Sequence, residues 1–531
     1  MTTAPVGEAP RVTVPREYNA AVDLIERNLK AGRADKVAFR DGQSSLTYGA
    51  LAERVDRCAN ALRSLGLEPE QRVLLILLDT FDFPVAFLGA IKAGIVPVPV
   101  NTLLTAAEYD FMLRDSRARA LIVSDALYDK LAGVIADQPA LRHVVVSGAD
   151  GHGRTRFGDL LAKAEPRAAA APTNADDICF WLYSSGSTGA PKGAVHLHSH
   201  LILTAELYAK PILGITEADT VFSAAKLFFA YGLGNALTFP MAVGASSLLL
   251  PERPTPAGVS RILKSGRPTI FYGVPTLYAA LLAFPELPKR EELALRRCVS
   301  AGEALPEEIG RRWTERMGVE ILDGIGSTEM LHIFLSNRPG EVRYGTTGKP
   351  VPGYDVRLVG DDGNAADVGE VGELQISGPT SAPFYWNQRE RSRTTFLGPW
   401  TRSGDKYVRD ADGYFTYCGR TDDMLKVGGI YVSPFEVEAA LTTHEAVLEA
   451  AVVGSPDEQK LVKPRAYVVV KPGVRPDGAL AEALKFHVKS RLAPYKYPRW
   501  IEFIDELPKT ATGKIQRFKL RARSAPTGKP S

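Results

Sequence analysis

The chain has 531 residues, of which 45% are hydrophobic and 24% are charged, and its formal net charge is +3. This length is too great for one ordinary core, so we expect two or more domains. The small net charge gives no reason to expect a nucleic acid or a membrane as partner. The first residues lack the basic and apolar regions of a secretory signal, and no apolar run approaches about 18 residues. We therefore expect a cytoplasmic protein.

Alternating helices and strands are predicted in the first half of the chain. Apolar residues recur at helical spacing from Leu51 to Leu62, with Thr47 as the predicted N-cap and Gly66 at the end. The next predicted elements are a strand over 73–78, a helix over 84–92, a strand over 95–100, a helix opening with a capping box at Thr105 to Glu108, and strands at 121–123 and 144–146. This alternation predicts parallel sheets covered by helices.

The composition changes near residue 420, where the segment from Gly419 to Gly429 is polar and rich in glycine. We place a domain boundary at Arg420 to Asp423, which divides the chain into 1–420 and 421–531. The elements predicted after it are a helix over 434–441 with a capping box at Ser433 to Glu436, strands at 451–454 and 466–470, a helix at 482–491 and a strand at 500–504. They form a small α+β unit.

The four cysteines are scattered and form no C-x-x-C pair. Most of them lie in apolar segments, so we expect buried free thiols in a reducing compartment. The positions concerned are Cys58, Cys179, Cys298 and Cys418.

A glycine- and hydroxyl-rich loop from Tyr183 to Gly193 follows the apolar run 178–182. Glycines permit close backbone approach, hydroxyls add donors and a lysine adds positive charge, so the loop suits a polyphosphate. The predicted ligands are Ser184, Ser185, Gly186, Ser187, Thr188, Gly189 and Lys192. It is not a Walker A loop, because Pro191 stands where the second glycine belongs.

Two further loops carry polar groups suited to a nucleotide. The segment from Asp323 to Glu329 combines two glycines with the hydroxyl of Thr328 and a carboxylate able to hold Mg²⁺ on phosphates. Taken alone, this segment would be interpreted as a common glycine-rich turn. The presence of the loop at Ser184 makes nucleotide binding the better interpretation. Asp405 follows a glycine and has the chemistry to accept both ribose hydroxyls.

With these loops in this order, the chain resembles the adenylate-forming superfamily, which includes acyl- and aryl-CoA synthetases, luciferases and peptide-synthetase adenylation domains. The resemblance implies an α/β fold class, with a large N-terminal domain of parallel and mixed sheets layered with helices and a small mobile C-terminal α+β domain. It implies ATP, Mg²⁺ and coenzyme A as substrates and cofactors.

The resemblance also implies roles for individual residues. Thr328 would contact the α-phosphate, and Glu329 and Thr188 would hold the metal. The nucleoside would be bound by Gly302, Glu303, Ala304, Asp323, Gly324, Ile325, Asp405 and Arg420. Many members carry an aromatic residue in place of Ile325, which puts aromatic stacking on adenine from this position in question.

Lys514 is the predicted catalytic lysine, on a loop near the C-terminus. In the family this lysine is delivered to the site where carboxylate meets phosphate, and its charge relieves the repulsion between two anions. The other predicted catalytic residues are Thr328, Glu329 and His198. Because acetylation would remove the charge, we expect a protein lysine acetyltransferase and a deacetylase as partners acting on Lys514.

Asp422 is the predicted hinge about which the small domain would rotate between two half-reactions. Lys426, Gly428 and Gly429 would then face the pocket and leave room for the pantetheine arm. Basic side chains at Lys489, Arg491, Lys496 and Arg499 have the charge to meet coenzyme A phosphates, although a solvated face is the preferred interpretation.

His196, His198 and His200 alternate as zinc ligands would. A strand leading from the phosphate loop, with His198 near the acyl pocket, explains them better, because no fourth ligand is evident.

The acid is predicted from the segments 228–235 and 330–337, which resemble those of benzoate–CoA ligases. Aromatic residues there are equally typical of an ordinary core. By resemblance, a short aryl pocket would be lined by Phe229, Ala230, Tyr231, Gly326, His332 and Ile333. A long fatty acid would need a longer cavity.

The reaction implied is AMP-forming ligation of benzoate, or a close aromatic carboxylate, to coenzyme A through an acyl-AMP. Three alternatives are a stand-alone enzyme loading an aryl acid onto a carrier protein, a CoA ligase for 4-hydroxybenzoate or another aryl or short acyl acid, and an inactive homologue serving as a scaffold. The last is opposed by the intact set Thr188, Lys192, Glu329, Asp405 and Lys514. The sequence is compatible with a homodimer.

Overall fold

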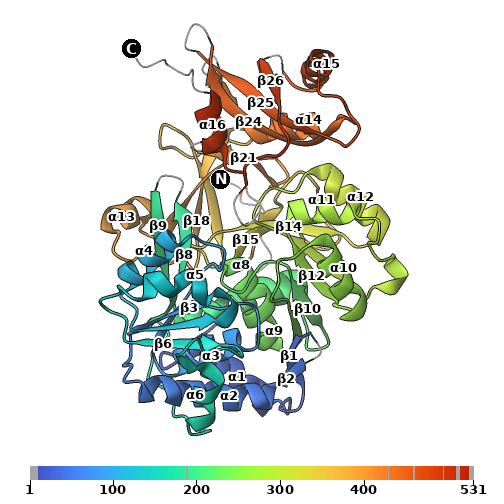
Figure 1. The fold of residues 1–531 in the computed structure, drawn as a ribbon. Coiled ribbons are helices and arrows are strands. Elements are labelled where there is room, and N and C mark those ends of the chain that lie inside the picture. Colours follow the sequence, from blue (N-terminus) through green and yellow to red (C-terminus); the bar gives the residue numbers. More distant parts are fainter. Residues whose placement is uncertain are drawn as a thin grey trace.

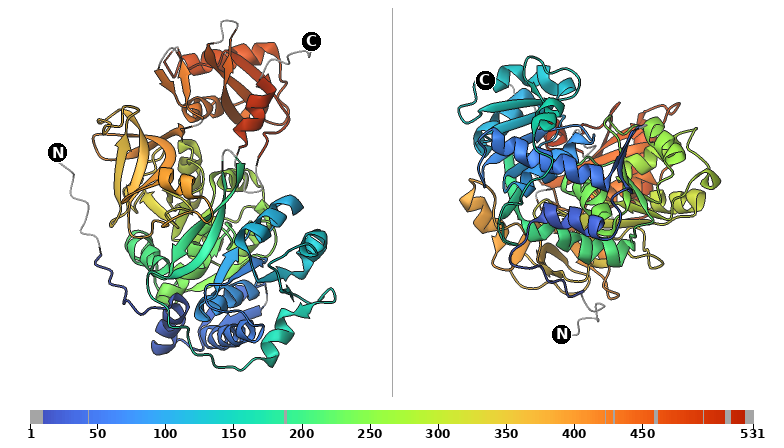
Figure 2. Two further views of the ribbon diagram at one scale, coloured as in Figure 1. Left: turned by 90° about the vertical axis from the view of Figure 1, so that its left-hand side faces the viewer. Right: turned by 90° about the horizontal axis from the view of Figure 1, so that it is seen from below.

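The computed structural model describes residues 10–42, 44–186, 189–421, 423–427, 430–457, 461–493, 495–509 and 515–524. Its elements form a larger part, which ends with β21, and a smaller part, which begins with β22 and lies at the top of Figure 1. Figure 2 shows the same separation from the side. The α/β fold with a large first part and a small second part is confirmed.

A five-stranded parallel sheet comes first, in the order β4-β3-β5-β6-β7. The strands are β3 (Arg72–Ile76), β4 (Val96–Pro99), β5 (Ala120–Ser124), β6 (His143–Ser147) and β7 (Thr155–Arg156). The helices along this stretch are α1 (Ala20–Lys30), α2 (Tyr48–Ser64), α3 (Asp82–Lys92), α4 (Ala106–Ser116), α5 (Asp125–Ile135) and α6 (Phe157–Lys163). Every residue of β5 is buried, as expected for a parallel strand covered on both faces.

A nine-stranded mixed sheet forms the centre of the larger part, in the order β16-β15-β14-β13-β12-β10-β11-β1-β2. Its strands are β1 (Val37–Asp41), β2 (Ser44–Thr47), β10 (Thr220–Ser223), β11 (Ser246–Leu249), β12 (Ile270–Gly273), β13 (Arg297–Ser300), β14 (Ile321–Gly326), β15 (Ile333–Ser336) and β16 (Lys349–Pro350). The run from β1 through β14 is parallel, whereas β2, β15 and β16 are antiparallel to their neighbours.

Both α-helices and π-helical segments accompany this sheet. The α-helices are α7 (His198–Thr204), α8 (Ala230–Leu233), α9 (Phe239–Val243), α10 (Pro256–Ser265), α11 (Pro275–Ala283) and α12 (Glu307–Met317). Two π-helical segments, η1 (Ala205–Leu213) and η2 (Gly234–Thr238), and a short 3₁₀ turn, η3 (Arg290–Glu292), complete the set. The hairpin of β8 (Ile178–Gly186) and β9 (Gly189–Leu197) forms its own two-stranded sheet.

The last sheet of the larger part is antiparallel and leads to the smaller part. It contains β17 (Asp355–Val359), β18 (Val371–Ser377), β19 (Phe396–Leu397), β20 (Trp400–Arg409) and β21 (Phe415–Arg420), with α13 (Arg389–Thr395) before β19. The smaller part contains β22 (Leu425–Val427), β23 (Ile430–Val432), α14 (Pro434–Thr442), β24 (Val447–Pro456), β25 (Val462–Val470), α15 (Gly478–Lys489), β26 (Trp500–Phe503) and α16 (Arg517–Ser524). The sequence boundary at 420–423 falls between β21 and β22.

Local signals in the sequence set several helix ends. The Thr47 hydroxyl accepts the backbone N–H of Ala50 at 3.2 Å, and α2 is followed by Gly66 at φ +77°. The capping box at Thr105 is present, and the Ser433 hydroxyl accepts the N–H of Glu436 at 3.2 Å. The N-caps at Thr47 and Ser433 and the capping box at Thr105 are confirmed, whereas the Glu436 carboxylate, predicted to complete a second capping box, accepts from Lys496 Nζ at 2.6 and 2.7 Å. All four cysteines are free and buried, also as predicted. Within the described ranges, no helix is long and apolar enough to cross a membrane.

Candidate active site

The residues predicted to bind adenine lie at the carboxyl edge of the nine-stranded sheet. The loop containing Gly302, at φ +96°, follows β13, and Asp323 to Ile325 lie on β14 beside it. Ligands in α/β sheets bind at this edge. Burial raises the pKa of the Asp323 carboxyl well above its usual range, and its Oδ1 has no hydrogen-bond partner in the described structure. A buried acceptor without a partner fits the predicted adenine site, since adenine carries an amine.

The phosphate loop is the end of a β-hairpin. Strands β8 and β9 pair antiparallel, with Ser184 opposite Lys192 and Gly186 opposite Gly189. A strand therefore follows this loop, whereas a helix follows a Walker A loop. The hairpin carries Lys192 back toward the sheet edge.

Lys192 meets the carboxylate of Glu329 at this edge. The Lys192 Nζ donates to Glu329 Oε1 at 2.7 Å, and Tyr385 Oη donates to the same oxygen at 2.6 Å. Burial opposes ionisation of Glu329, but the charge of Lys192 and these two bonds outweigh it and lower the pKa from 4.5 to about 2. The structure thus brings together Lys192 and Glu329, which were predicted from separate motifs.

The chemistry of Glu329 fits the predicted Mg²⁺. An ionised carboxylate is the hard oxygen ligand that Mg²⁺ prefers, and this ion commonly takes its other ligands from water and substrate phosphates. Accordingly, the part of the chain that the structure describes contains no group of three or more His, Cys, Asp or Glu side chains arranged to hold a metal.

The three alternating histidines are not all on a strand, because β9 ends at Leu197 and the next residues begin α7. His200 lies in the first turn of α7, and its Nδ1 atom is 3.0 Å from that of His196 at the end of β9. His196 Nε2 donates to the carbonyl of Thr328 at 2.8 Å. Burial lowers the pKa of His196 to about 4, so the ring is neutral at pH 7. The histidine that contacts the Thr328 turn is therefore His196.

His198 has other contacts. Its Nδ1 accepts the backbone N–H of Ala20 in α1 at 3.1 Å, and burial lowers its pKa to about 4. This bond joins α7 to α1. The catalytic role of His198 stays a prediction, and the sequence missed both His196 and Tyr385.

The predicted ribose pair is formed across β20 and β21. Arg420 Nη1 donates to Asp405 Oδ1 at 3.0 Å and to the carbonyl of Ser403 at 2.9 Å. The charge of Asp405 raises the pKa of Arg420. Gly404 lies under the guanidinium at φ +72°, where a Cβ would approach Arg420 Nη2 at 2.8 Å, so glycine is required there.

The predicted aryl-pocket residues lie on or next to three elements, α8, β14 and β15. Phe229 is the N-cap of α8, and Gly326 pairs with Ile333 across β14 and β15. His332 is buried against Phe239, with ring centroids 4.5 Å apart, and its Nε2 lies 3.2 Å from Oδ1 of Asn235. The Tyr231 and His332 rings are 5.7 Å apart. Phe229, Ala230, Tyr231 and Gly326 are half-buried, whereas His332 and Ile333 are buried.

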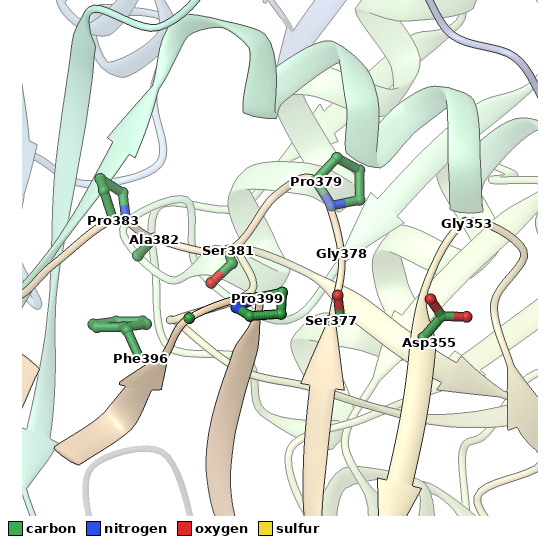
Figure 3. A pocket seen from close by; sticks show the side chains of 11 residues that line it. Gly353, Asp355, Ser377, Gly378, Pro379, Ser381, Ala382, Pro383, Phe396 and Pro399 are labelled. Atoms are coloured by element: carbon green, nitrogen blue, oxygen red, sulfur yellow. The ribbon is translucent and has the colours of Figure 1, made fainter. Parts of the chain in front are cut away.

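A separate cavity of about 460 Å³ lies beside the segment 377–383 (Figure 3). Ser381, Ala382 and Phe396 are among its lining residues, and none of the six predicted aryl-pocket residues lines it.

Several predicted site residues lie outside the described structure. They are Ser187, Thr188, Asp422, Gly428, Gly429 and Lys514, together with the side chains of Ser185 and Lys426.

Comparisons with known proteins agree with this arrangement. The model of the AMP-binding enzyme family matches residues 25–386, and that of the AMP-binding enzyme C-terminal domain matches 436–514. The chain belongs to the AMP-binding enzyme family. This AMP-binding enzyme is 62% identical over 515 residues, or 97% of each chain, to the benzoate–CoA ligase of Thauera aromatica. It is 52% identical to the 4-hydroxybenzoate–CoA/benzoate–CoA ligase of Rhodopseudomonas palustris, over 95% of this chain and 94% of the other.

Solved structures agree as well. A benzoate CoA ligase from Burkholderia xenovorans has a TM-score of 0.89 and 58% identity, covering 95% of this chain and 100% of its own. An anthranilate CoA ligase in complex with anthranoyl-AMP has a TM-score of 0.92 and 45% identity, covering 96% and 98%. The predicted membership of the adenylate-forming superfamily is confirmed.

Proposed function

We propose that the chain is an AMP-forming benzoate–CoA ligase, converting ATP, benzoate and coenzyme A to AMP, pyrophosphate and benzoyl-CoA. The observation that carries the ATP chemistry is the meeting of Lys192 with Glu329 at 2.7 Å on the sheet edge. The choice of benzoate is supported by 62% identity over nearly the whole chain to a benzoate–CoA ligase.

The reaction has two steps. A carboxylate oxygen of benzoate bonds to the α-phosphorus of ATP, the bond to the bridging oxygen breaks, and pyrophosphate leaves. The thiol of coenzyme A then gives its proton to solvent, its sulfur bonds to the acyl carbon, and AMP leaves with the electron pair of the broken C–O bond. The first step brings the benzoate carboxylate against the anionic triphosphate, so placed positive charge is its chief requirement.

The residues of the larger part would bind and orient the nucleotide. Lys192 would turn from Glu329 to the phosphates, and Glu329, with Thr188, would hold Mg²⁺. When bound, that ion would neutralise phosphate charge. The remaining nucleotide contacts proposed are Ser184, Ser185, Gly186, Ser187, Gly189, Gly302, Glu303, Ala304, Asp323, Gly324, Ile325 and Thr328, with Asp405 and Arg420 on the ribose.

The residues after β21 would serve the reacting groups. Lys514 would bring its charge to the carboxylate and α-phosphate for adenylation. Rotation at Asp422, the proposed boundary of a 1–420 and a 421–531 domain, would replace it with the loop containing Lys426, Gly428 and Gly429 for thiol attack. Acetylation of Lys514 would silence adenylation.

We further propose a cytoplasmic enzyme acting as a homodimer, to be checked by fractionation and by light scattering.

The deciding experiment measures acid-dependent pyrophosphate release and CoA thioester formation with benzoate, 4-hydroxybenzoate, anthranilate and hexanoate. We expect the highest kcat/KM with benzoate. A preference for hexanoate would contradict the proposal.

A second candidate is loading of an aryl acid onto a carrier protein. It is favoured by 34% identity over 96% of this chain to a p-hydroxybenzoic acid–AMP ligase of Mycobacterium tuberculosis, although the match spans 69% of that protein. Free coenzyme A separates the two: acyl-AMP formation without any CoA thioester would favour carrier loading.

A further inference from the structure

A short segment, residues 382–386, joins the phosphate hairpin to the turn that carries Glu329. On one side the N–H of Trp386 donates to the carbonyl of Gly193 at 2.8 Å, and the N–H of Val195 donates to that of Phe384 at 3.2 Å. On the other side the N–H of Ala382 donates to the backbone carbonyl of Glu329 at 2.7 Å. The segment therefore sets the spacing between two elements whose side chains would bind ATP.

The side chain of Tyr385 makes the same connection between charged groups. Its hydroxyl donates to Glu329 Oε1 at 2.6 Å and accepts from Lys192 Nζ at 2.8 Å, and Lys192 Nζ lies 4.5 Å from the ring centroid. The ring packs on Phe396, with centroids 5.1 Å apart, and Phe396 also lines the cavity of Figure 3. Tyr385 is 2% exposed. Both hydrogen-bonding functions of the phenol are thus used inside the cluster.

The hydroxyl is not what pairs the two charges, because Lys192 also bonds Glu329 directly. Its effect is orientation. A long lysine and a glutamate have many rotamers, and a fixed third partner between them removes that freedom. Hydrogen bonds to ionised groups are short and directional, and those made before a ligand arrives reduce the reorganisation that binding requires.

We infer that Tyr385 is a positioning residue for MgATP. It fixes the relative positions of the Lys192 ammonium and the Glu329 carboxylate. The ammonium can then contact the phosphates, and the carboxylate can contact the metal, with little movement of either chain segment. This inference rests on the proposed adenylation function, and it adds to it a residue outside the phosphate and metal motifs.

The test is Tyr385→Phe, which keeps the ring on Phe396 and removes only the hydroxyl. Tyr48→Phe is the matched control, because Tyr48 is also buried and donates at 2.6 Å to a carbonyl, that of Ala245, in another region. We expect Tyr385→Phe to weaken MgATP binding about tenfold or more, as lost bonds to charged groups do. KM for benzoate and the rate of thioester formation from supplied benzoyl-AMP should stay unchanged. Tyr48→Phe should leave MgATP affinity unchanged.

Calorimetric titration with MgATP, without acid or coenzyme A, is the primary measurement, and thermal unfolding of each variant accompanies it. Unchanged MgATP affinity in Tyr385→Phe would overturn the inference. So would a parallel fall in both half-reactions together with the unfolding temperature, because that pattern marks a merely structural role.

A double-mutant cycle shows whether Tyr385 acts through the carboxylate. In a Glu329→Gln background, Tyr385→Phe should change MgATP affinity by much less than in the unmodified chain. Full additivity would contradict the inference. The titration measures MgATP binding without turnover, so its result for Tyr385 does not depend on the acid. Failure of the unmodified chain to activate benzoate would overturn the proposed function alone.

Discussion

The charges on the two sides of the proposed hinge are held in different ways. In the larger part, Lys192 and Glu329 are 137 residues apart in sequence, their side chains are 20% and 13% exposed, and both are tied to Tyr385. In the smaller part, Arg517 pairs with Glu438 in α14, and Arg521 pairs with Asp423, next to the proposed hinge. The contact between Lys192 and Glu329 forms only when distant segments of the larger part fold together. The two arginine pairs lie within the smaller part and the linker. Substitutions on the two sides should therefore affect the two half-reactions differently.

The largest difference is expected from Lys514→Ala. Loss of one well-placed charge in the transition state costs about 10²–10³-fold in rate, so formation of benzoyl-AMP should fall by that factor or more. Thioester formation from supplied benzoyl-AMP should be spared, because no carboxylate then meets phosphate. Single-turnover assays of each half-reaction provide the measurement. An equal loss in both would assign Lys514 to structure.

Glu329→Gln should damage the larger part itself. Removing one partner of a fully buried ion pair destabilises a fold by about 3–5 kcal/mol, and this part-buried pair should cost up to that amount, since Lys192 keeps its charge without a counter-ion. Lys192→Met combined with Glu329→Gln should recover much of that loss, while MgATP affinity stays measurably below that of the unmodified chain. Urea unfolding of the single and double variants gives the free energies. A double variant as unstable as the sum of the singles would show that the pair is not coupled.

The same pair predicts a pH dependence. The pKa of Glu329 is lowered from 4.5 to about 2, so its stabilisation is complete above pH 4.5 and is lost as the pH falls through about 2. Unfolding free energies of the unmodified chain and the double variant should therefore converge over that window. A constant difference between them down to pH 2 would contradict this assignment.

Asp422→Pro tests the linker. Proline fixes φ near −65° and would hold the junction in one orientation, so thioester formation should fall far more than formation of benzoyl-AMP. Folding of both parts should be unaffected, because residues 421–424 lie between β21 and β22. If both half-reactions keep the unmodified rates, the hinge is elsewhere.

Local sequence patterns predicted the helices and strands well. They could not predict contacts between segments that are distant in sequence. Thr47, Thr105 and Ser433 signal their helices through neighbours three residues away, which a sequence displays directly. Lys192 and Glu329 were found because each belongs to a recognisable loop. Tyr385 is 193 residues from Lys192 and belongs to no motif that was singled out, so its role appears only in the fold.

The histidines illustrate the same limit at short range. A spacing of two residues predicts one strand face, but β9 ends at Leu197, and the change from strand to helix at that point brings His200 of α7 beside His196 of β9. The position at which a strand ends is set by packing, which the periodicity of three histidines does not encode.

The smallest effect on catalysis is expected from substitutions in the predicted aryl pocket, because they change the shape of the pocket and remove no charge. His332 and Ile333 follow the Glu329 turn and are buried, and a Cβ on Gly234 would approach His332 Cδ2 at 2.4 Å, so the imidazole has little room to move.

Ile333→Ala should open space beside the ring of the substrate. His332→Ala should do so too, and it would also leave Asn235 without its partner. In both variants we expect kcat/KM for ortho- or meta-substituted benzoates to rise relative to benzoate, since one methylene in an apolar pocket changes discrimination roughly 10–200-fold. Phe334→Ala is the matched control for Ile333→Ala, because successive side chains of β15 point to opposite faces and Phe334 is equally buried. A substrate panel run on all three variants, with unfolding temperatures beside it, makes the measurement. If Phe334→Ala changes the ranking of acids as much as the other two do, the effect is loss of stability, and the pocket assignment of His332 and Ile333 is wrong.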